Sequence, residues 1–403
     1  MATGDTRSTS FRLYPTPEQY ALMAQFAGAC RYVYNLALEQ RRNWYRPGRK
    51  ISFASQCREV TQLRAEVDWI RAAPADALHQ AMRDLDAAYR SWWAGRSGPP
   101  RPRRKSSTDS FRFPDPENFR IKRTGRSSGK IKLPKIGWVS FRGWTDIPGA
   151  LKNVTVVRRA GKWFASVQHE YILTQSEPPP SAVGIDMGVA VFATLSDGTS
   201  IAPANHGKKA LRALRKAQRA LARKKKGSAN RRKAVLRIAR IQQRVANARK
   251  DFLHKHSTAI AKSHGIVVME DLKVRAMSAS AKGTAEEPGS KVRQKSGLNR
   301  SILDQGWHMF RTMLAYKLKD RGGELILVPP QYTSQMCSEC GHISSDNRKS
   351  QAAFTCTSCG HKANADCNAA INILRRADSA LKPVEGHRIK RPDEAGTSRG
   401  EVA

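Results

Sequence analysis

Two closely spaced cysteine pairs stand late in this 403-residue sequence, Cys337-x-x-Cys340 and Cys356-x-x-Cys359. Fifteen residues separate the pairs, and this spacing is typical of a zinc ribbon in which four thiolates bind one Zn²⁺. Because four thiolates leave no open coordination position for a substrate, the predicted role of the zinc is structural.

Three carboxylates elsewhere in the chain have a different chemical character. Asp186 in VGIDMG and Glu270 in VVMEDL each end an apolar, strand-like run, and Asp366 begins the helical pattern DCNAAINIL seven residues after Cys359. A carboxylate at a buried strand end is costly unless it binds a cation. Three of them suit a hard, oxygen-ligated ion such as Mg²⁺, and two such ions about 4 Å apart can hydrolyse a phosphodiester bond.

Each carboxylate also has an ordinary structural interpretation. Asp186 could cap a turn, Glu270 could pair with a neighbouring lysine, and Asp366 could cap the start of its helix. Residue types alone do not distinguish Glu270 from its neighbour Asp271 as the second member of the site. The occurrence of all three at element ends, one of them just after the zinc motif, favours a shared metal site.

The charge of the chain points to a polyanionic partner. There are 72 Lys and Arg against 33 Asp and Glu, a formal net charge of +39. Solubility requires far less, and such a charge favours the neutralisation of phosphates, so we predict that the chain binds nucleic acid. The excess is concentrated in residues 207–250, which carry eighteen Lys or Arg.

A basic helical hairpin is predicted over residues 207–256. A thin apolar stripe indicates two helices joined near KKKGSAN. The contacts with the nucleic-acid backbone are predicted at the cations around this turn: Lys224, Lys225, Lys226, Arg231 and Arg232. The alternative is a solvated surface hairpin, but like charges repel one another unless phosphates lie opposite them.

The sequence shows no signal for a membrane location. No apolar leader is present near the first residues, and no run reaches the roughly 18 apolar residues of a membrane helix. The cysteine usage fits metal binding in a reducing compartment better than a disulfide framework. We therefore expect a cytoplasmic protein that does not associate with a membrane.

The elements that would position these groups fall into two halves. In the first half, a strand around FRLY precedes a helix that begins at Thr16, in capping-box spacing with Gln19, and a second helix has apolar residues from Leu78 to Trp92 at helical spacing. These helices predict a bundle. Residues 111–172 alternate in the manner of a small β-barrel or sandwich, and the stiff linker SEPPPS at residues 176–181 predicts a domain boundary.

In the second half, residues 181–201 predict a buried strand, a Gly turn and an antiparallel partner, while GIVVMEDL and ELILVPP predict two more strands. Between these two we predict a loop from about Ala276 to Gly297 and one helix over residues 301–322. The polar tail, residues 377–403, is predicted to be disordered.

At these motifs the sequence resembles the TnpB proteins of insertion-sequence transposons, which are related to compact type V CRISPR effectors. The resemblance runs from RLYPTPEQ through GIDMGVAVFATLSDG, VVMEDL, GLNRSILDQGW and QYTSQMCSECG to DCNAAINIL, nearly the whole chain to about Leu374. It implies an α+β multidomain fold: an N-terminal helical recognition bundle with a wedge-like β-barrel, then a RuvC-like α/β nuclease domain of the RNase H fold with an inserted zinc ribbon. The implied ranges are 1–15 and 111–176 for the barrel, 16–110 for the bundle, 181–331 and 365–376 for the nuclease, and 332–364 for the ribbon.

The resemblance also implies roles. Asp186, Glu270 and Asp366 match the catalytic acids of the family, and the four cysteines match its zinc ligands. The implied activity is that of an RNA-guided DNA endonuclease, favoured as a monomer, in which a guide RNA selects double-stranded target DNA beside a short flanking motif and two Mg²⁺ ions support hydrolysis.

Two other functions fit the residues less fully. A nuclease without a guide would use the carboxylates but leave the N-terminal half without a role. A regulator that binds nucleic acid without cleaving it would not need the complete set of acids. No Tyr or Ser recombination nucleophile is recognisable in the sequence, which disfavours a direct transposase.

Overall fold

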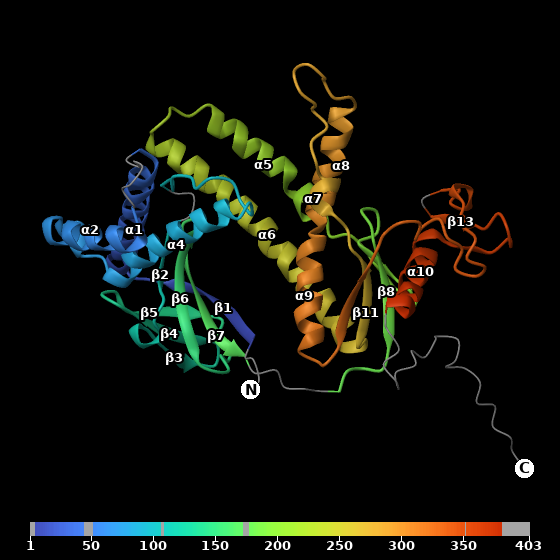
Figure 1. The fold of residues 1–403 in the computed structure, drawn as a ribbon, viewed down its shortest axis with the longest axis horizontal. Helices are drawn as coiled ribbons and strands as arrows, with labels where there is room; N and C mark the ends of the chain where they lie inside the picture. Colours follow the sequence, from blue (N-terminus) through green and yellow to red (C-terminus); the bar gives the residue numbers. More distant parts are fainter. Residues whose placement is uncertain (1–4, 44–50, 106–108, 172–176, 351, 381–403) are drawn as a thin grey trace, which may run out of the picture. The chain divides into compact units, whose positions relative to one another are not determined.

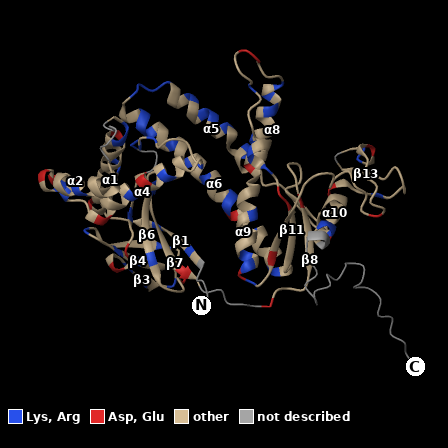
Figure 2. Cartoon of the chain, in the orientation of Figure 1, with Lys and Arg blue, Asp and Glu red and all other residues tan. Residues whose placement is uncertain are grey.

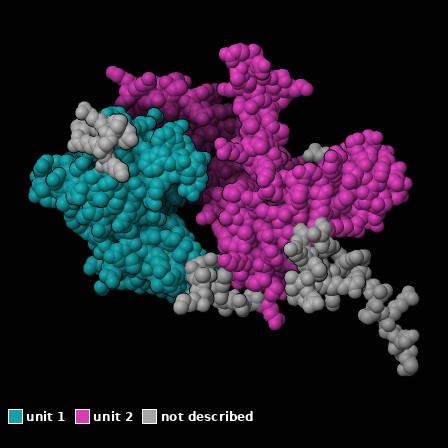
Figure 3. All heavy atoms as spheres, viewed as in Figure 1, with its two compact units in different colours: residues 1–172 teal, residues 173–403 magenta. Residues whose placement is uncertain are grey.

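The computed structural model describes residues 5–43, 51–105, 109–171, 177–350 and 352–380 (Figure 1). The chain divides into two compact units, residues 1–172 and 173–403, and the division falls just before the predicted linker (Figure 3). We call these unit 1 and unit 2 and describe each by itself. No helix within the described ranges is both long enough and apolar enough to cross a membrane.

Helices of unit 1 lie within the range predicted for the bundle. They are α1 (Pro17–Asn43), α2 (Phe53–Glu66), α3 (Asp68–Arg71) and α4 (Ala75–Trp93). The start of α1 has the predicted capping box, because Thr16 N donates to Gln19 Oε1 at 3.1 Å and Gln19 N donates to Thr16 Oγ1 at 3.3 Å. Phe26 of α1 and Leu85 of α4 are buried in one apolar core.

Seven antiparallel strands form the sheet of unit 1. They are β1 (Asp5–Tyr14), β2 (Ser110–Phe113), β3 (Arg120–Gly125), β4 (Ser128–Leu133), β5 (Gly137–Arg142), β6 (Leu151–Arg159) and β7 (Lys162–Tyr171). Their order is β2-β6-β7-β1-β5-β4-β3, so the first strand of the chain lies inside the sheet. The described residues contain no pairing between the end strands β2 and β3, and therefore not the hydrogen bonds that would close the predicted barrel.

A five-stranded sheet organises unit 2. Its strands are β8 (Ala182–Met187), β9 (Ala193–Leu195), β10 (Ser200–Ile201), β11 (Ile266–Glu270) and β12 (Glu324–Val328). The order is β10-β9-β8-β11-β12, with β8, β11 and β12 parallel and the pairs β8–β9 and β9–β10 antiparallel. The strands predicted in this half are confirmed, including the antiparallel partner after the Gly turn.

Six helices accompany this sheet in the described part of unit 2. They are α5 (His206–Ala222), α6 (Ala229–Ser263), α7 (Val274–Met277), α8 (Val292–Gln305), α9 (Trp307–Lys319) and α10 (Ala365–Ala380). The predicted basic hairpin is present as α5 and α6, although α6 extends past residue 256.

Three predictions about this part of the chain were wrong. The single helix predicted over residues 301–322 is broken at Gly306, whose φ of 76° lies in the left-handed region, and α8 begins at Val292, inside the predicted loop. The predicted tail starts too early, because α10 continues to Ala380. The rest of the tail lies outside the described residues.

Candidate active site and zinc cluster

Two parallel strands of unit 2 carry a carboxylate at the same end and on the same face of the sheet. The register pairs Ile185 of β8 with Met269 of β11, so Asp186 and Glu270 are the next residues on neighbouring strands. Ile185 and Met269 are buried in the core that the sheet shares with α6 and α9. Because side chains alternate along a strand, Asp186 and Glu270 belong to the opposite face, where α10 packs.

The helix α10 brings the third carboxylate to this face. Gly184 lies so close to α10 that a Cβ atom there would be 2.1 Å from the carbonyl oxygen of Ala370, a contact that only glycine allows. Asn364 caps the helix, because its Oδ1 accepts hydrogen bonds from the amides of Asp366 and Cys367 at 3.0 and 3.1 Å. The capping role considered for Asp366 is therefore filled by Asn364.

All three predicted carboxylates line one cavity of about 250 Å³, formed where β8, β11 and α10 meet. Arg348, from the segment that carries the cysteines, lines the same cavity and donates to Asp366 Oδ1 at 2.9 Å. The carboxylate oxygens are not drawn together like the ligand atoms of a formed metal site. In the part of the chain that the structure describes, only the four cysteines have three or more ligand atoms all within 4.8 Å of one another.

The surroundings of this cavity disfavour the ionised forms of Asp186 and Glu270. Burial, reinforced by the negative charges of Glu270 and Asp366, raises the pKa of Asp186 to about 7. Burial also raises the pKa of Glu270, against a hydrogen bond from Thr333 that lowers it. Partly buried carboxylates that have raised pKa values and line a common cavity are typical of functional sites.

Asp271, the alternative to Glu270, does not line the cavity. Its carboxylate accepts hydrogen bonds from Lys273 Nζ at 2.9 Å and from an Arg311 guanidinium nitrogen at 2.8 Å. These two hydrogen bonds lower the pKa of Asp271. The ion pair with a lysine that was considered for Glu270 is thus formed by Asp271 instead. The structure therefore favours Glu270, and not Asp271, as the carboxylate of the cavity.

Thr333 is a site residue that sequence reasoning missed. Its buried hydroxyl donates to Glu270 Oε1 at 2.5 Å and to the carbonyl oxygen of Pro330 at 3.1 Å. Asn372 of α10 donates to the carbonyl oxygen of Thr333 at 3.0 Å. Thr333 therefore connects β11 to α10, the helix that carries Asp366. The sequence signal that could have identified Thr333 is its position in QYTSQMC, four residues before Cys337.

The four predicted zinc ligands form one cluster. The Sγ atoms of Cys337 and Cys359 lie 3.7 Å apart, and those of Cys340 and Cys356 lie 3.6 Å apart. A tetrahedral Zn²⁺ with Zn–S bonds of about 2.3 Å places its sulfurs about 3.8 Å apart, so the cluster fits zinc. A glycine follows the second cysteine of each pair, Gly341 after Cys340 and Gly360 after Cys359. Their φ angles of 75° and 74° lie in the left-handed region, which allows a tight turn directly after each pair.

The cysteine cluster is fixed to α10. Ser338 N donates to Asn368 Oδ1 at 2.8 Å, and Asn368 Nδ2 donates to the carbonyl oxygen of Met336 at 2.8 Å. The short hairpin of β13 (Ala353–Thr355) and β14 (Lys362–Asn364) leads directly into α10. The helix that carries Asp366 is therefore held by the main chain and by the buried Asn368, which forms hydrogen bonds with the cysteine-bearing segment.

The predicted nucleic-acid contacts lie at the turn between α5 and α6, and Figure 2 shows Lys and Arg along both helices. Four of the five predicted residues are exposed: Lys224, Lys225, Lys226 and Arg232. Arg231 differs, because its guanidinium donates to the carbonyl oxygens of Leu221 and Lys224 at 3.3 and 3.4 Å. Arg231 thus stabilises the end of α5, and the other four are better placed to contact phosphates.

Comparison with protein families matches three parts of the chain. Residues 163–281 match a family described as "Probable transposase", residues 307–373 match the "Cas12f1-like, TNB domain", and residues 3–50 match a "Helix-turn-helix domain". The second match includes the cysteine cluster and Asp366.

Relatives align over almost the full length. The chain is 42% identical over 375 residues to "Putative RNA-guided DNA endonuclease InsQ" of Escherichia coli (strain K12), with 92% of each chain covered. It is 35% identical to "Putative RNA-guided DNA endonuclease" of Streptomyces pristinaespiralis, with 98% of this chain and 95% of the relative covered. The chain belongs to the TnpB family. This confirms the resemblance seen at the motifs.

Solved structures share the fold of this TnpB chain. The TM-score is 0.57 to a chain of the "Cryo-EM structure of the Cas12f1-sgRNA-target DNA complex", at 16% identity and with 92% of this chain and 99% of that chain covered. It is 0.51 to the "Structure of the mini-RNA-guided endonuclease CRISPR-Cas_phi3", at 11% identity and with 95% and 94% covered. The TnpB chain therefore has the mixed α/β architecture of compact CRISPR effectors.

Proposed function

We propose that this chain is an RNA-guided DNA endonuclease that hydrolyses phosphodiester bonds at the cavity of Asp186, Glu270 and Asp366. The observation that carries the proposal is the convergence of these carboxylates, from two neighbouring strands and one helix, on a single cavity. The names of two relatives that align over almost the full length state the same activity. The cleaved substrate would be double-stranded target DNA beside a short flanking motif.

The residues of the cavity fit Mg²⁺. The three carboxylates are the oxygen donors that this ion prefers. Burial and mutual repulsion raise the pKa of Asp186, and a cation between the carboxylates offsets both effects. When bound, a pair of Mg²⁺ ions supplies an activated water and stabilises the leaving oxygen of the phosphodiester.

Two further residues prepare the cavity for its substrate. Thr333 donates a hydrogen bond to Glu270, which favours the ionised carboxylate and fixes its orientation. Arg348 offsets the charge of Asp366 and lines the same cavity, where a guanidinium is suited to bind a phosphate oxygen. The protein thus has both signs of charge at the site, one for the cation and one for the DNA.

The domain roles follow the same proposal. The five-stranded sheet, with its first strand central and its last two strands parallel to it, supports a RuvC-like nuclease domain of the RNase H fold. The four cysteines would hold a structural Zn²⁺ that braces α10. Unit 1 would contain the helical recognition part and the wedge-like part.

The excess positive charge supports nucleic-acid partners. A guide RNA and two DNA strands together present many phosphates, and a net charge of +39 is suited to them. We assign the exposed cations of the α5–α6 turn to the guide RNA or to its hybrid with target DNA.

Sequencing the RNA that copurifies with the protein tests the proposal directly. One enriched species with a fixed part and a variable end supports guidance, and a plasmid that matches the variable end should then be cut in Mg²⁺ while a mismatched plasmid is not. A random sample of RNA, with cleavage independent of sequence, would favour the nuclease without a guide. An enriched RNA without any cleavage by the wild type would favour the regulator.

A further inference from the structure

Two helices of unit 2 that carry the same charge pack side by side. α5 contains six Lys or Arg and no acidic residue, and α6 contains a single acidic residue, Asp251. Figure 1 shows α5 beside α6, with α8 near the start of α5. Of the 17 residues of α5, all of which the structure describes, only Ala217 is buried. Apolar packing between the two helices is therefore thin, while their like charges repel each other.

The start of α5 is held by a residue of another helix. Asn205, which precedes α5, has a left-handed backbone with φ of 51°, and its side chain makes no capping hydrogen bond. Asp304 of α8 supplies the cap instead, because its carboxylate accepts hydrogen bonds from the amides of Gly207 at 2.9 Å and Lys208 at 3.2 Å. The same carboxylate accepts a hydrogen bond from the guanidinium of Arg249 of α6 at 2.7 Å. One carboxylate thus joins the start of α5 to α6.

The position of Asp304 favours α5 and α6 rather than its own helix. It lies one residue before the end of α8, where the helix dipole disfavours a negative charge, whereas the start of α5 is the positive end of a helix. Burial raises the pKa of Asp304, but the hydrogen bonds from Arg249 and from the two amides of α5 outweigh burial and lower it. The side chain is 7% exposed, so salt screens these contacts only weakly. Asp304 is therefore an ionised link between two cationic helices.

We infer that Asp304 is a positioning residue for nucleic-acid binding, because it holds α5 against α6 and so aligns the cations of both helices before a phosphate backbone binds. The inference rests on the proposed function, in which the hairpin binds nucleic acid. A cavity of about 380 Å³ lies between the helices and is lined by Ala213 of α5 and by four cations of α6: Lys233, Arg237, Arg240 and Arg244. A phosphate backbone there would itself offset the repulsion between the helices. If only a fraction of the molecules have the helices aligned, the affinity falls in proportion to that fraction.

A matched pair of variants tests the inference. Asp304→Asn keeps the size of the side chain and removes its charge. Asp251→Asn is the control, because Asp251 is exposed on α6 and pairs only with Lys255 of the same helix among the ion pairs of the described residues. Both variants make the chain more positive by one charge, which by itself favours the binding of a polyanion. The measurement is the affinity of the full chain, freed of copurified nucleic acid, for a fluorescent RNA–DNA hybrid of about 20 base pairs.

Asp304→Asn should bind the hybrid about tenfold more weakly than wild type, the change expected if the helices are aligned in about one molecule in ten. Asp251→Asn should bind at least as tightly as wild type. Unchanged or tighter binding by Asp304→Asn, or equal losses in the two variants, would overturn the inference.

Hydrogen exchange separates a local loss of position from a general loss of stability. The amides of α5 should exchange faster in Asp304→Asn than in wild type, while those of β8 and β11 exchange at the wild-type rate. Bound hybrid should slow the exchange of α5 again, because phosphates then hold the two helices together. Unchanged exchange in α5, or faster exchange throughout unit 2, would contradict a positioning role.

Gly207→Ala is a second test that leaves Asp304 in place. Alanine by itself strengthens a helix relative to glycine. A Cβ atom at position 207 would be 2.8 Å from Asp304 Oδ1, however, so the methyl group would displace the carboxylate. Gly207→Ala should therefore weaken binding of the hybrid on its own and have little further effect in a chain that already carries Asp304→Ala. Equal effects in both backgrounds would exclude the carboxylate as the cause.

Cleavage by the wild type separates this inference from the proposed function. If wild type cuts guide-matched DNA while Asp304→Asn binds the hybrid as wild type does, only the inference is wrong. If the expected losses of affinity and of α5 protection are observed but wild type cuts no DNA, the positioning role of Asp304 stands and the proposed cleavage fails.

Discussion

In the cysteine cluster all four ligand atoms lie within 4.8 Å of one another, whereas the three carboxylates line a cavity of about 250 Å³ and one of them is paired with Arg348. The cysteines come from two similar tight turns close together in the sequence. The carboxylates come from β8, β11 and α10, and so from distant parts of unit 2. Both groups meet at α10, which follows the second cysteine turn and carries Asp366.

The difference agrees with the two functions that we propose for these groups. A site made from local turns is arranged by its own backbone and can be closed around its metal. A site made from distant elements depends on the assembled sheet and helix, and it must leave room for a substrate and for water. The first kind of site stabilises the fold, whereas the second kind can form only after the chain has folded.

Replacing a carboxylate should abolish cleavage at the carboxylate cavity and leave the cysteine cluster intact. Asp186→Ala, Glu270→Ala or Asp366→Ala should each reduce cleavage at least about a hundredfold in saturating Mg²⁺, the scale of removing one electrostatic interaction from an active site. Zinc content and DNA binding should remain, because neither depends on these groups. Single-turnover cleavage, metal analysis and DNA affinity measure the three properties.

Asp271→Ala is the control for this series, because Asp271 is adjacent to Glu270 but does not line the cavity. Its cleavage rate should stay within a few-fold of wild type. Nearly normal cleavage by one of the other three variants would remove that residue from the site, and complete loss with Asp271→Ala would place Asp271 in the site instead of Glu270.

Disrupting the cysteine cluster should affect both the cluster itself and the carboxylate cavity. Cys337→Ser combined with Cys340→Ser should release zinc and lower the folded yield, because thiolate sites couple metal binding to folding. Cleavage should fall as well, since Asn368 connects the cysteine segment to α10. Cys367→Ser is the matched control, next to Asp366 but outside the cluster, and it should keep its zinc. Full zinc retention in the double variant would show that other ligands hold the metal.

Charge reversal in the basic hairpin should leave both sites unchanged and weaken nucleic-acid binding. Replacing Lys224, Lys225, Lys226 and Arg232 by Glu should make the plot of log affinity against log salt concentration shallower, by roughly one unit for each phosphate that is no longer neutralised. Arg231 is left in place because it stabilises the end of α5.

A pair of single variants provides the control for the hairpin. Lys225→Glu at the turn and Lys262→Glu near the other end of α6 change the net charge equally at two exposed positions. Only Lys225→Glu should alter the slope for RNA or for guide-dependent DNA binding. Equal slopes for wild type and the quadruple variant would make the hairpin a solvated surface.

The smallest expected effect concerns the hydrogen bond from Thr333. Thr333→Val removes a donor to the ionised Glu270, so the pKa of Glu270 should rise further above its ordinary value. A protonated carboxyl binds Mg²⁺ poorly, and the low-pH decline of cleavage should therefore move to higher pH, with more Mg²⁺ needed at acidic pH. Thr333→Ser keeps the hydroxyl and should restore the wild-type profile. Superimposable profiles for all three proteins would remove Thr333 from the site.

Several parts of this architecture could be predicted from the sequence because their patterns are local. The cysteine spacing indicates zinc, and the apolar runs before Asp186 and Glu270 indicate strands whose ends share one edge of a sheet. Thr333 and Arg348 could not be found in this way, because they reach the cavity from loops whose path no periodicity describes. The break at Gly306 was missed because an apolar helical pattern continues on both sides of it.

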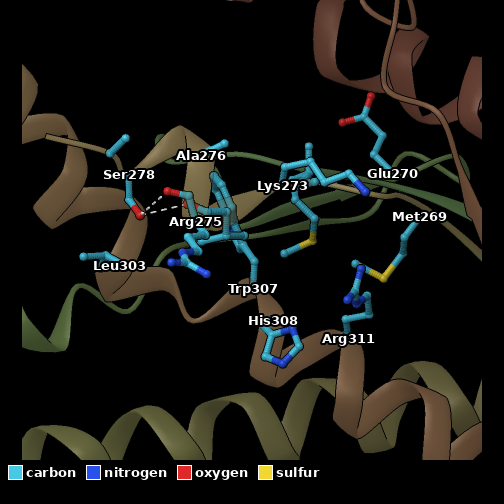
Figure 4. A pocket seen from close by; sticks show the side chains of 14 residues that line it. Met269, Glu270, Lys273, Arg275, Ala276, Ser278, Leu303, Trp307, His308 and Arg311 are labelled. Carbon is cyan, nitrogen blue, oxygen red and sulfur yellow. Dashed lines mark hydrogen bonds between the residues drawn. The ribbon is translucent and has the colours of Figure 1, made fainter. Parts of the chain in front are cut away.

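A cavity of about 940 Å³, which lies between the ends of β8 and β11 and the helices α7, α8 and α9 (Figure 4), was also not predictable from the sequence. Its lining comes from strand ends and from α7, α8 and α9, and α8 lies partly in a segment whose composition is that of a loop. Composition is a weak predictor where tertiary contacts stabilise a helix. The cavity therefore appears only when these elements are placed around Met269 and Trp307.

Because Gly184 has no side chain, β8 and α10 can approach closely, and this approach limits the separation between Asp186 and Asp366. Since β8 and α10 touch there through main-chain atoms, their separation is limited by the van der Waals radii of the backbone. A smaller apolar residue elsewhere in the interface, such as at Val268 or Ile373, would therefore not bring Asp186 nearer to Asp366. A methyl group at position 184 would instead push the helix away. The close contact at Gly184 thus sets the smallest separation that the two elements can have, and any side chain at this position would increase it.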